Sequence, residues 1–155
     1  MPPFEIENLS SLKQWEGREF PATDWFAVTQ DSIQKFADAA EDRQWIHVDT
    51  ERAQRESPFG GTVAHGFLTL SLLGYWIRQA VQIRSGVAIT INYGLNKVRF
   101  PSAVRAGSPL RARVTLLSAK PSPEFVDAVF LIHVESESSA KPCCVAEWLV
   151  RYYPK

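Results

Sequence analysis

The spacing of hydrophobic residues changes in character partway along the chain. In the first half, apolar positions recur at helical intervals, and from Val87 onward they alternate with polar positions. A period of 3.6 residues is typical of a helix with one buried face, and a period of two is typical of a half-buried strand. The sequence therefore predicts helices early and strands late, which indicates an α+β protein with an antiparallel sheet.

Two short helices are predicted before the middle of the chain. After Thr29, apolar residues recur at helical spacing at Ile33, Phe36, Ala37 and Ala40. The hydroxyl of Thr29 can accept a hydrogen bond from the first free amides, so a helix over about 30–40 is expected. Asp49 or Thr50 can cap a second helix that ends near Arg55. The segment between the two helices is expected to be a connection.

A longer central helix is predicted over Val63–Arg84. Its first half is apolar on nearly all sides, which indicates a buried helix. Arg78 and Arg84 near the expected end suit the negative pole of a helix, and Gly86 suits a left-handed C-cap. The longest apolar stretch, 67–77, is far shorter than the roughly 20 residues that span a bilayer, so no membrane association is expected.

The alternating half of the chain predicts four successive antiparallel strands, separated by Pro, Ser and Gly clusters, at 87–91, 110–117, 126–134 and 145–153. Earlier strands are expected around 25–28 and possible at 18–20. His133 lies within one of the alternating segments and is interpreted as a cross-strand surface residue. No repeat or linker divides the chain, so we expect one domain over 1–155.

The charge balance argues against a polyanionic partner. Lys and Arg total 17, as do Asp and Glu, so no net charge attracts nucleic acid or an anionic membrane over long range. Cations do gather in one stretch, at Lys97, Arg99, Arg105, Arg111 and Arg113. Such a cluster could hold one phosphorylated small molecule, and a solvated strand face explains it as well.

The two cysteines and the first residues suggest a cytoplasmic location. Cys143 and Cys144 are neighbours, and neighbouring residues on a strand point to opposite faces, so a disulfide between them is not expected. A reducing compartment is consistent with this. Residues 1–5 lack a basic region followed by an apolar one, so no signal peptide is predicted.

A carboxylate and an imidazole lie five residues apart at Asp42 and His47, where the helical period is lost. A turn can bring the two side chains together on one water. Apolar neighbours, Trp45 and Ile46, can shift their pKa values toward neutrality, as acid–base catalysis requires. The residues alone leave another interpretation open, in which Asp42 is a surface acid and His47 bonds within a turn.

Gly66 lies near the expected start of the central helix. A backbone amide there can stabilise the oxyanion that develops on a thioester carbonyl, and close packing explains a glycine equally well. Other chemistries lack their motifs: the chain has no phosphate-binding P-loop, no dinucleotide fingerprint and no nucleophile elbow. A zinc site from His47, Asp49 and His65 lacks the usual ligand spacing, so no metal is expected.

Two separated blocks of the chain resemble the hydratase-2 signature of MaoC-like dehydratases. The first is F-A-D-A-A-E-D-R-Q-W-I-H-V-D at 36–49, and the second combines P-F-G at 58–60 with A-H-G-F at 64–67. The run 91–101 is similar to the subgroup related to nodulation protein N and to bacterial 3-hydroxyacyl-thioester dehydratases. The resemblance covers about 30–152, and the two blocks agree in order and spacing, which makes it specific.

This resemblance implies a single hot-dog fold, in which an antiparallel sheet wraps around a long central helix, and usually a homodimer with the active site near the subunit interface. It implies reversible hydration of trans-2-enoyl thioesters, of coenzyme A or acyl carrier protein, to (3R)-hydroxyacyl thioesters, with no cofactor. Asp42 and His47 match the family's acid–base pair, and Gly66 matches the glycine whose amide faces the substrate carbonyl.

Further substrate-binding candidates in these blocks and nearby are Gln44, Ile46, His65, Phe67, Asn96, Arg99 and Arg105, with the two arginines as candidates for phosphate contacts. The chain departs from the family pattern at Gln44-Trp45, where many members have Asn-Pro, and at Gly74, where some have a small hydroxyl residue. Two alternatives therefore remain open: a hot-dog thioesterase, and a module that binds acyl thioesters without turnover.

Overall fold

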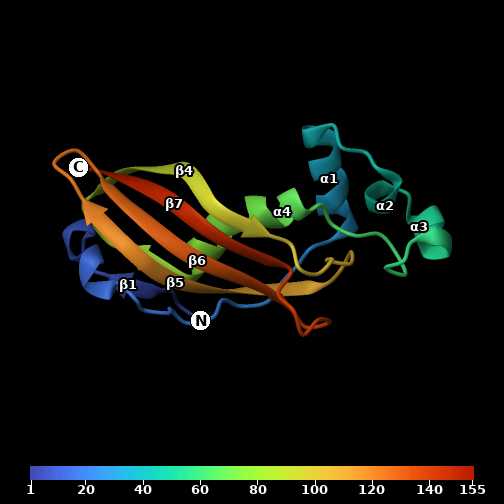
Figure 1. Cartoon of the computed structure of the whole chain (residues 1–155), viewed down its shortest axis with the longest axis horizontal. Helices are drawn as coiled ribbons and strands as arrows, with labels where there is room; N and C mark the ends of the chain where they lie inside the picture. Colours follow the sequence, from blue (N-terminus) through green and yellow to red (C-terminus); the bar gives the residue numbers. More distant parts are fainter.

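The computed structural model describes all 155 residues and contains a curved five-stranded antiparallel sheet. In spatial order its strands are β2 (Phe26–Ala27), β5 (Pro109–Pro121), β6 (Val126–Ser136), β7 (Cys144–Pro154) and β4 (Val87–Arg99). The central helical segment, α4 (Gly66–Ser71) and α5 (Leu73–Ala80), passes behind the sheet in green (Figure 1). This arrangement confirms the α+β class and the hot-dog architecture that the sequence predicted.

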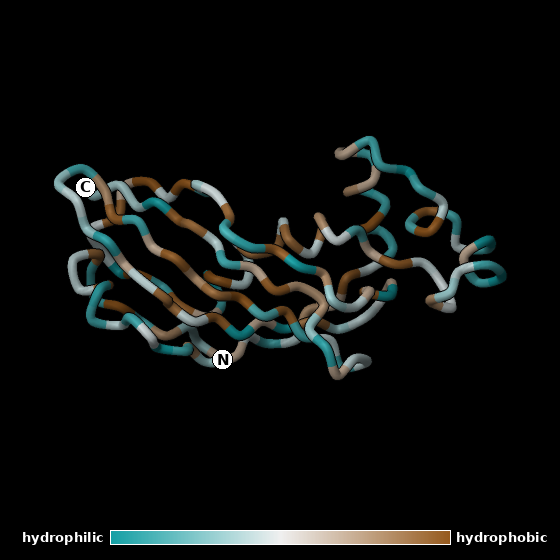
Figure 2. Tube along the Cα trace, viewed as in Figure 1, coloured by the Kyte–Doolittle hydropathy of each residue, from teal (hydrophilic) through white to brown (hydrophobic).

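The core lies between the sheet and α5. Side chains along β6 are alternately buried and partly exposed over its whole length, and hydrophobic and hydrophilic positions alternate along the strands (Figure 2). Phe130 on β6 and Trp76 on α5 are among the largest fully buried side chains. His133 occupies the outward face of β6, as predicted. Burying one large apolar side chain contributes about 1.5–3 kcal/mol, so this layer supplies much of the stability.

The early helices follow their capping signals. Helix α1 (Gln30–Ala40) begins after Thr29, whose hydroxyl accepts a hydrogen bond of 3.2 Å from the amide of Ser32. Helix α3 (Thr50–Glu56) begins after Asp49, whose carboxylate accepts from the amide of Arg52. The connection between them is not irregular throughout, because Trp45–Val48 forms the single helical turn α2.

The predicted helix over Val63–Arg84 is wrong at both ends. Helix α4 begins only at Gly66, a break at Leu72 separates it from α5, and α5 ends at Ala80. The hydroxyl of Ser71 donates to the carbonyl of Leu68 at 2.7 Å, a local bond that competes with regular helix geometry at this break.

Residues Val81–Ile83 form strand β3 instead of continuing the helix, because they pair in parallel with β1 (Phe4–Ile6). Arg84 lies beyond this strand, where its amide donates to the carbonyl of Ile6 and its side chain pairs with Glu5. Gly86 has a φ of 82° but turns the chain from β3 into β4, so it is not the helix cap that we expected.

The five cations that are close in the sequence do not form one cluster in the structure. Lys97 lies on the edge strand β4 and Arg111 and Arg113 lie on β5, with β6 and β7 between them. Arg111 pairs with Glu135 at 3.0 Å, and Arg113 pairs with Glu19 at 2.8 Å. These contacts favour the solvated-face interpretation for the β5 arginines.

The possible strand at 18–20 is reduced to one isolated bridge between Glu19 and Thr115.

The two cysteines and the lengths of the helices are two further features of the structure. Cys143 and Cys144 are both free and buried, and burial raises the pKa of Cys143 to about 12 and that of Cys144 to about 11. No helix has the length and apolar character needed to cross a membrane. The N-terminal region adds one 3-10 helix, η1 (Leu9–Trp15), which packs Leu9 and Leu12 into the core.

Candidate functional site

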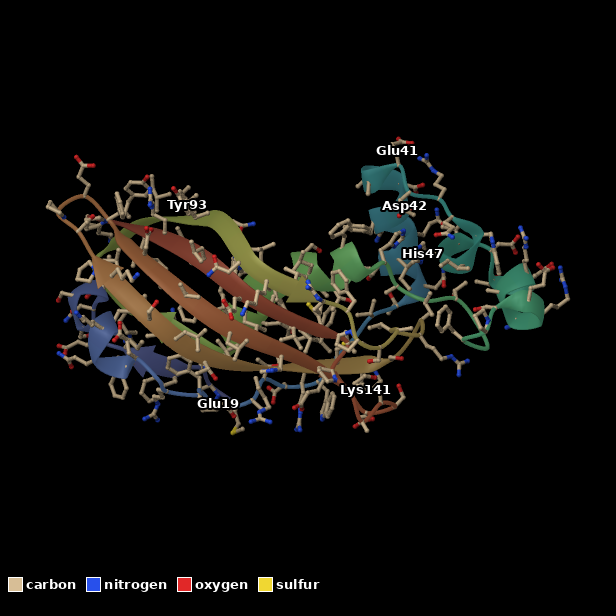
Figure 3. The ribbon with its side chains drawn as sticks, viewed as in Figure 1. Glu19, Glu41, Asp42, His47, Tyr93 and Lys141 are labelled. Atoms are coloured by element: carbon tan, nitrogen blue, oxygen red, sulfur yellow. The ribbon has the colours of Figure 1, made fainter.

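The helices α1, α2 and α3 lie beyond one end of the sheet (Figure 1). Asp42 and His47 lie in this region (Figure 3), Asp42 between α1 and α2 and His47 within α2. Asp42 follows directly after α1. The preceding residue, Glu41, has a left-handed backbone with φ of 56°, and the amides of both residues donate to the carbonyl of Ala37. A left-handed non-glycine residue costs about 1 kcal/mol. The protein thus maintains a strained turn where Asp42 leaves the helix.

His47 is buried at the end of α2, with a relative exposure of 7%. Its Nδ1 lies 2.6 Å from the carbonyl oxygen of Val63. A carbonyl can only accept a hydrogen bond, so Nδ1 carries the proton and Nε2 of the neutral ring presents its lone pair. This bond fixes both the orientation of the ring and the tautomer that acid–base chemistry needs.

His65 is packed directly against His47. The two rings are stacked with centroids 3.7 Å apart and planes inclined by 23°. His65 is only 3% exposed, and its Nε2 lies 2.9 Å from the carbonyl oxygen of Asp42. Its Nδ1 is buried without a partner. His65 therefore contacts both the backbone of Asp42, by a hydrogen bond, and the ring of His47, by stacking, and it is itself buried.

The three side chains of Asp42, His47 and His65 converge, with one ligand atom of each within 4.8 Å of the others. The Asp42 side chain is 54% exposed, so it faces solvent beside two buried imidazoles. Arg43 does not neutralise it, because its guanidinium pairs with Asp38 and Glu41. The Asp42 Oδ2 lies 4.0 Å from Nε2 of His65. The site thus combines a solvent-facing carboxylate with a ring nitrogen of His47 that can accept a proton.

The surroundings favour the neutral form of His47. Burial lowers the pKa of its imidazole below the ordinary 6.5, the charge of a protonated His65 acts in the same direction, and the bond to Val63 and the charge of Asp42 act against it. His47 is therefore a neutral base around pH 7.

The same cluster fits a metal ion poorly. The in-plane lone pairs of stacked imidazoles run side by side, whereas a tetrahedral ion needs donors that converge on one point. Asp49, the carboxylate in the zinc set that the sequence analysis considered, instead caps α3 through the amide of Arg52 at 2.9 Å. The geometry thus favours the binding of a water or a substrate atom over an ion.

Gly66 follows His65 directly and is the first residue of α4, so its amide has no acceptor within the helix. A Cβ atom at this position would lie 3.0 Å from the ring of Phe100. The close packing is therefore observed, and the role of the amide at a thioester oxygen stays a prediction. The exposed ring of Phe100 would have to move to admit a side chain, and the Gly66 N–H has no helical acceptor next to the stacked histidines.

Two apolar cavities follow the central helices away from this cluster. One, of about 320 Å³, is lined by Phe36, Phe67, Leu70, Ser71, Leu73, Gly74, Asn92, Leu95 and Trp148. The other, of about 360 Å³, shares Gly74 and Trp148 with it and continues along α5. The ring of Phe36 lies 5.0 Å from that of His65, so the first cavity begins beside the cluster.

The other predicted site residues fall at several places. Gln44 precedes α2, and its side chain makes no capping hydrogen bond. The carbonyl of Ile46 accepts a hydrogen bond from the amide of Val63. Phe67 lines the first cavity and is 69% exposed. Asn96 and Arg99 are exposed on β4 and line neither apolar cavity.

Arg105 lines a separate polar cavity of about 240 Å³, and its guanidinium donates to the carbonyl of Gly60 at 2.9 Å. The same cavity contains Gln30, a residue that the sequence analysis did not single out. Gln30 bonds to the backbone of His47. No local pattern marks this contact, because it joins residues that are far apart in the chain.

Comparison with known proteins places these features in context. The MaoC like domain family model matches residues 12–128. The chain is 47% identical over 148 residues to 3-hydroxyacyl-thioester dehydratase Z of Mycobacterium tuberculosis, covering 95% of this chain and 97% of that protein. It is 41% identical over 143 residues to nodulation protein N of Rhizobium leguminosarum bv. viciae, covering 92% and 89%.

A solved structure agrees on the fold. The R-hydratase PhaJ1 of Pseudomonas aeruginosa in its unliganded form superimposes with a TM-score of 0.69 at 21% identity, covering 90% of this chain and 83% of that one. At this level of identity the likeness concerns the fold.

Proposed function

The chain belongs to the MaoC-like dehydratase family, and from that premise we propose that it reversibly hydrates trans-2-enoyl thioesters to (3R)-hydroxyacyl thioesters. A hydratase or dehydratase of the lyase class is what the family indicates. The observation that carries the finer proposal is the convergence of the Asp42 carboxylate with a buried, neutral His47. The acyl group is carried by coenzyme A or acyl carrier protein.

Asp42 and His47 together hold the reacting water in this mechanism. The pair removes one proton from the water as its oxygen bonds to C3, and it returns a proton to C2. Dehydration runs through the same steps in reverse. The Nδ1–H bond to Val63 keeps the Nε2 lone pair of His47 available for the transfer. General acid–base catalysis of this kind contributes about 10²–10⁴-fold in rate.

The amide of Gly66 supplies the electrophilic assistance. Attack at C3 pushes electron density onto the thioester oxygen, and a backbone N–H aimed at that oxygen stabilises the enolate. Support comes from the absence of an acceptor for this amide within α4 and from the Phe100 ring, which leaves no room for a side chain at Gly66. The apolar cavities that meet at Gly74 and Trp148 suit the acyl chain.

The experiment follows the loss of ultraviolet absorbance of the conjugated enoyl thioester, with crotonyl-CoA and a longer enoyl-CoA. We expect Asp42→Asn and His47→Gln to lower kcat by about 10²–10⁴-fold. The matched controls are Asp31→Asn on α1, where the carboxylate pairs with Lys35 at the surface, and His133→Gln on the outer face of β6, which should retain wild-type rates.

Two outcomes overturn this proposal. Release of free thiol without hydration indicates a thioesterase. A wild-type protein that binds enoyl-CoA but leaves the absorbance unchanged indicates a binding module. A chiral analysis of the product checks the (3R) configuration separately.

We also propose that two copies associate along β4, as the family resemblance implies. This edge strand has no neighbour on one side, and it exposes Ile89, Ile91, Tyr93 and Leu95, each at least 41%. An unpaired edge with exposed apolar side chains is suited to pairing with another strand. Light scattering should give twice the mass of one chain for the wild type and a smaller mass for Ile91→Lys. A monomeric wild type would contradict the dimer.

A further inference from the structure

Gln30, the first residue of α1, connects two segments that carry the candidate site. Its Nε2 donates to the carbonyl oxygen of His47 at 2.7 Å, and its Oε1 accepts from the hydroxyl of Thr62 at 2.5 Å. Thr62 is buried, with 6% exposure, and lies four residues before Gly66. One side chain therefore links the main chain behind the imidazole to the segment that leads into the free amide.

The chemistry of the contacts requires an amide at this position. The carbonyl of His47 can only accept, so the NH₂ group of Gln30 must face it. The amide oxygen is then left for Thr62, whose hydroxyl must donate. A glutamate would place an acceptor against the carbonyl, and a methionine would satisfy neither partner. Both ends of the Gln30 side chain are therefore specified by what they contact.

The two linked segments also bond to each other directly. The amide of Val63 donates to the carbonyl of Ile46 at 3.0 Å, and Nδ1 of His47 donates to the carbonyl of Val63 at 2.6 Å. On its far side, the carbonyl of Thr62 accepts from the amide of Ala106 at 3.0 Å. Gln30 closes this small network from α1 through two hydrogen bonds.

We propose that Gln30 is a positioning residue, which sets the imidazole of His47 at its working distance from the amide of Gly66. This inference rests on the proposed hydration reaction. Displacement of a reacting group by about 1 Å can cost about 100-fold in rate. A hydrogen-bonded clamp between the proton-transfer group and the oxyanion donor limits such displacement, and it does so without touching the substrate.

The experiment is a double-mutant cycle on kcat with Gln30→Met, Thr62→Val and the two combined. Each single change should lower kcat about ten- to a hundredfold, while KM changes less than about threefold. The double variant should be no slower than the slower single variant, because the clamp is broken only once. Gln30→Glu keeps the length of the side chain but loses the donor, so it should be as slow as Gln30→Met. Thr62→Ser keeps the hydroxyl that Thr62→Val loses, so its kcat should be close to that of the wild type.

Gln34→Met is the matched control, since Gln34 lies on the same helix and bonds only to Asp38 at the surface. It should retain wild-type kcat. Thermal unfolding of each variant separates a loss of fold from a loss of geometry.

Three results would overturn the clamp in a wild type that hydrates enoyl thioesters. The kcat of Gln30→Met could be unchanged, or the effects of Gln30→Met and Thr62→Val on kcat could multiply in the double variant. The third result is a loss of kcat that follows the loss of melting temperature across the variants. A wild type that hydrates no enoyl thioester defeats the proposed function itself, and with it any role for Gln30 in it.

Discussion

Strand β6 buries every second side chain in the core, whereas the segment from α1 to α3 buries only three apolar side chains, Ile33, Ala37 and Ala53. The first region is held together by many apolar contacts, which have no preferred direction. The second is ordered by a few directed hydrogen bonds, among them those of His47 to Val63 and of His65 to Asp42. Stability and active-site geometry are therefore maintained by different interactions, and substitutions should separate them.

The largest effect on stability is expected in the sheet. Ile132→Ala on β6 removes a fully buried side chain and should lower the free energy of unfolding by about 2–5 kcal/mol. Urea unfolding measures this loss, and Leu131→Ala on the outward face is the control. The kcat of the folded protein should stay within about twofold of wild type. A large fall in kcat would mean that the two regions are coupled.

An intermediate effect is expected at Gly66, where the regions meet. In Gly66→Ala the new methyl group meets the Phe100 ring at 3.0 Å. That ring is partly exposed and can move outward, so unfolding should change by less than about 1 kcal/mol. The kcat should fall about tenfold as the amide shifts. Adding Phe100→Ala should recover part of the rate, and an unchanged kcat in the single variant would contradict the role of the amide.

The pH dependence tests His47 in the second region. Its folded-state pKa lies below the ordinary 6.5 because burial disfavours the imidazolium. The unfolded chain therefore binds more protons as pH falls below 6.5, and the free energy of unfolding should decrease in that window. The acid limb of kcat/KM should also lie below pH 6.5. An apparent pKa at or above 6.5 would contradict a buried neutral base, and His47→Gln should weaken the pH dependence of unfolding.

At the start of α1 we expect a modest loss of stability with almost no loss of rate. Thr29→Ala removes the capping hydroxyl that accepts from the amide of Ser32 and should cost about 1 kcal/mol. Thr29→Ser should restore most of that energy. If Thr29→Ala also lowers kcat more than twofold, the helix that carries Gln30 is less firmly placed than the structure indicates. Denaturant unfolding and the enoyl-CoA assay on the same samples compare the two quantities.

The difference between the sheet and the segment from α1 to α3 also explains which features the sequence could predict. The strand at 126–134 was found because its alternation is a local consequence of one buried face. The residues 81–83 were misread as helix, since their conformation is decided by pairing with Phe4–Ile6, which is far away in the sequence. The closeness of Asp42 and His47 could be predicted because a short turn joins them, and their catalytic role stays a prediction. The stacking of His65 on His47 and the contacts of Gln30 bridge distant segments, and such hydrogen bonds leave no periodic signal.

The place of β7 in the sheet also bears on how the chain folds as it is synthesised. β7 lies between β6 and β4, and β4 has no other neighbour in the sheet. The ribosome makes β4 well before β7, so the backbone N–H and C=O groups of β4 have no strand partner until the residues of β7 emerge. Non-local pairing of this kind slows folding, and uncovered strands are prone to aggregate. The sheet therefore cannot be completed before its inner strand β7 has been made.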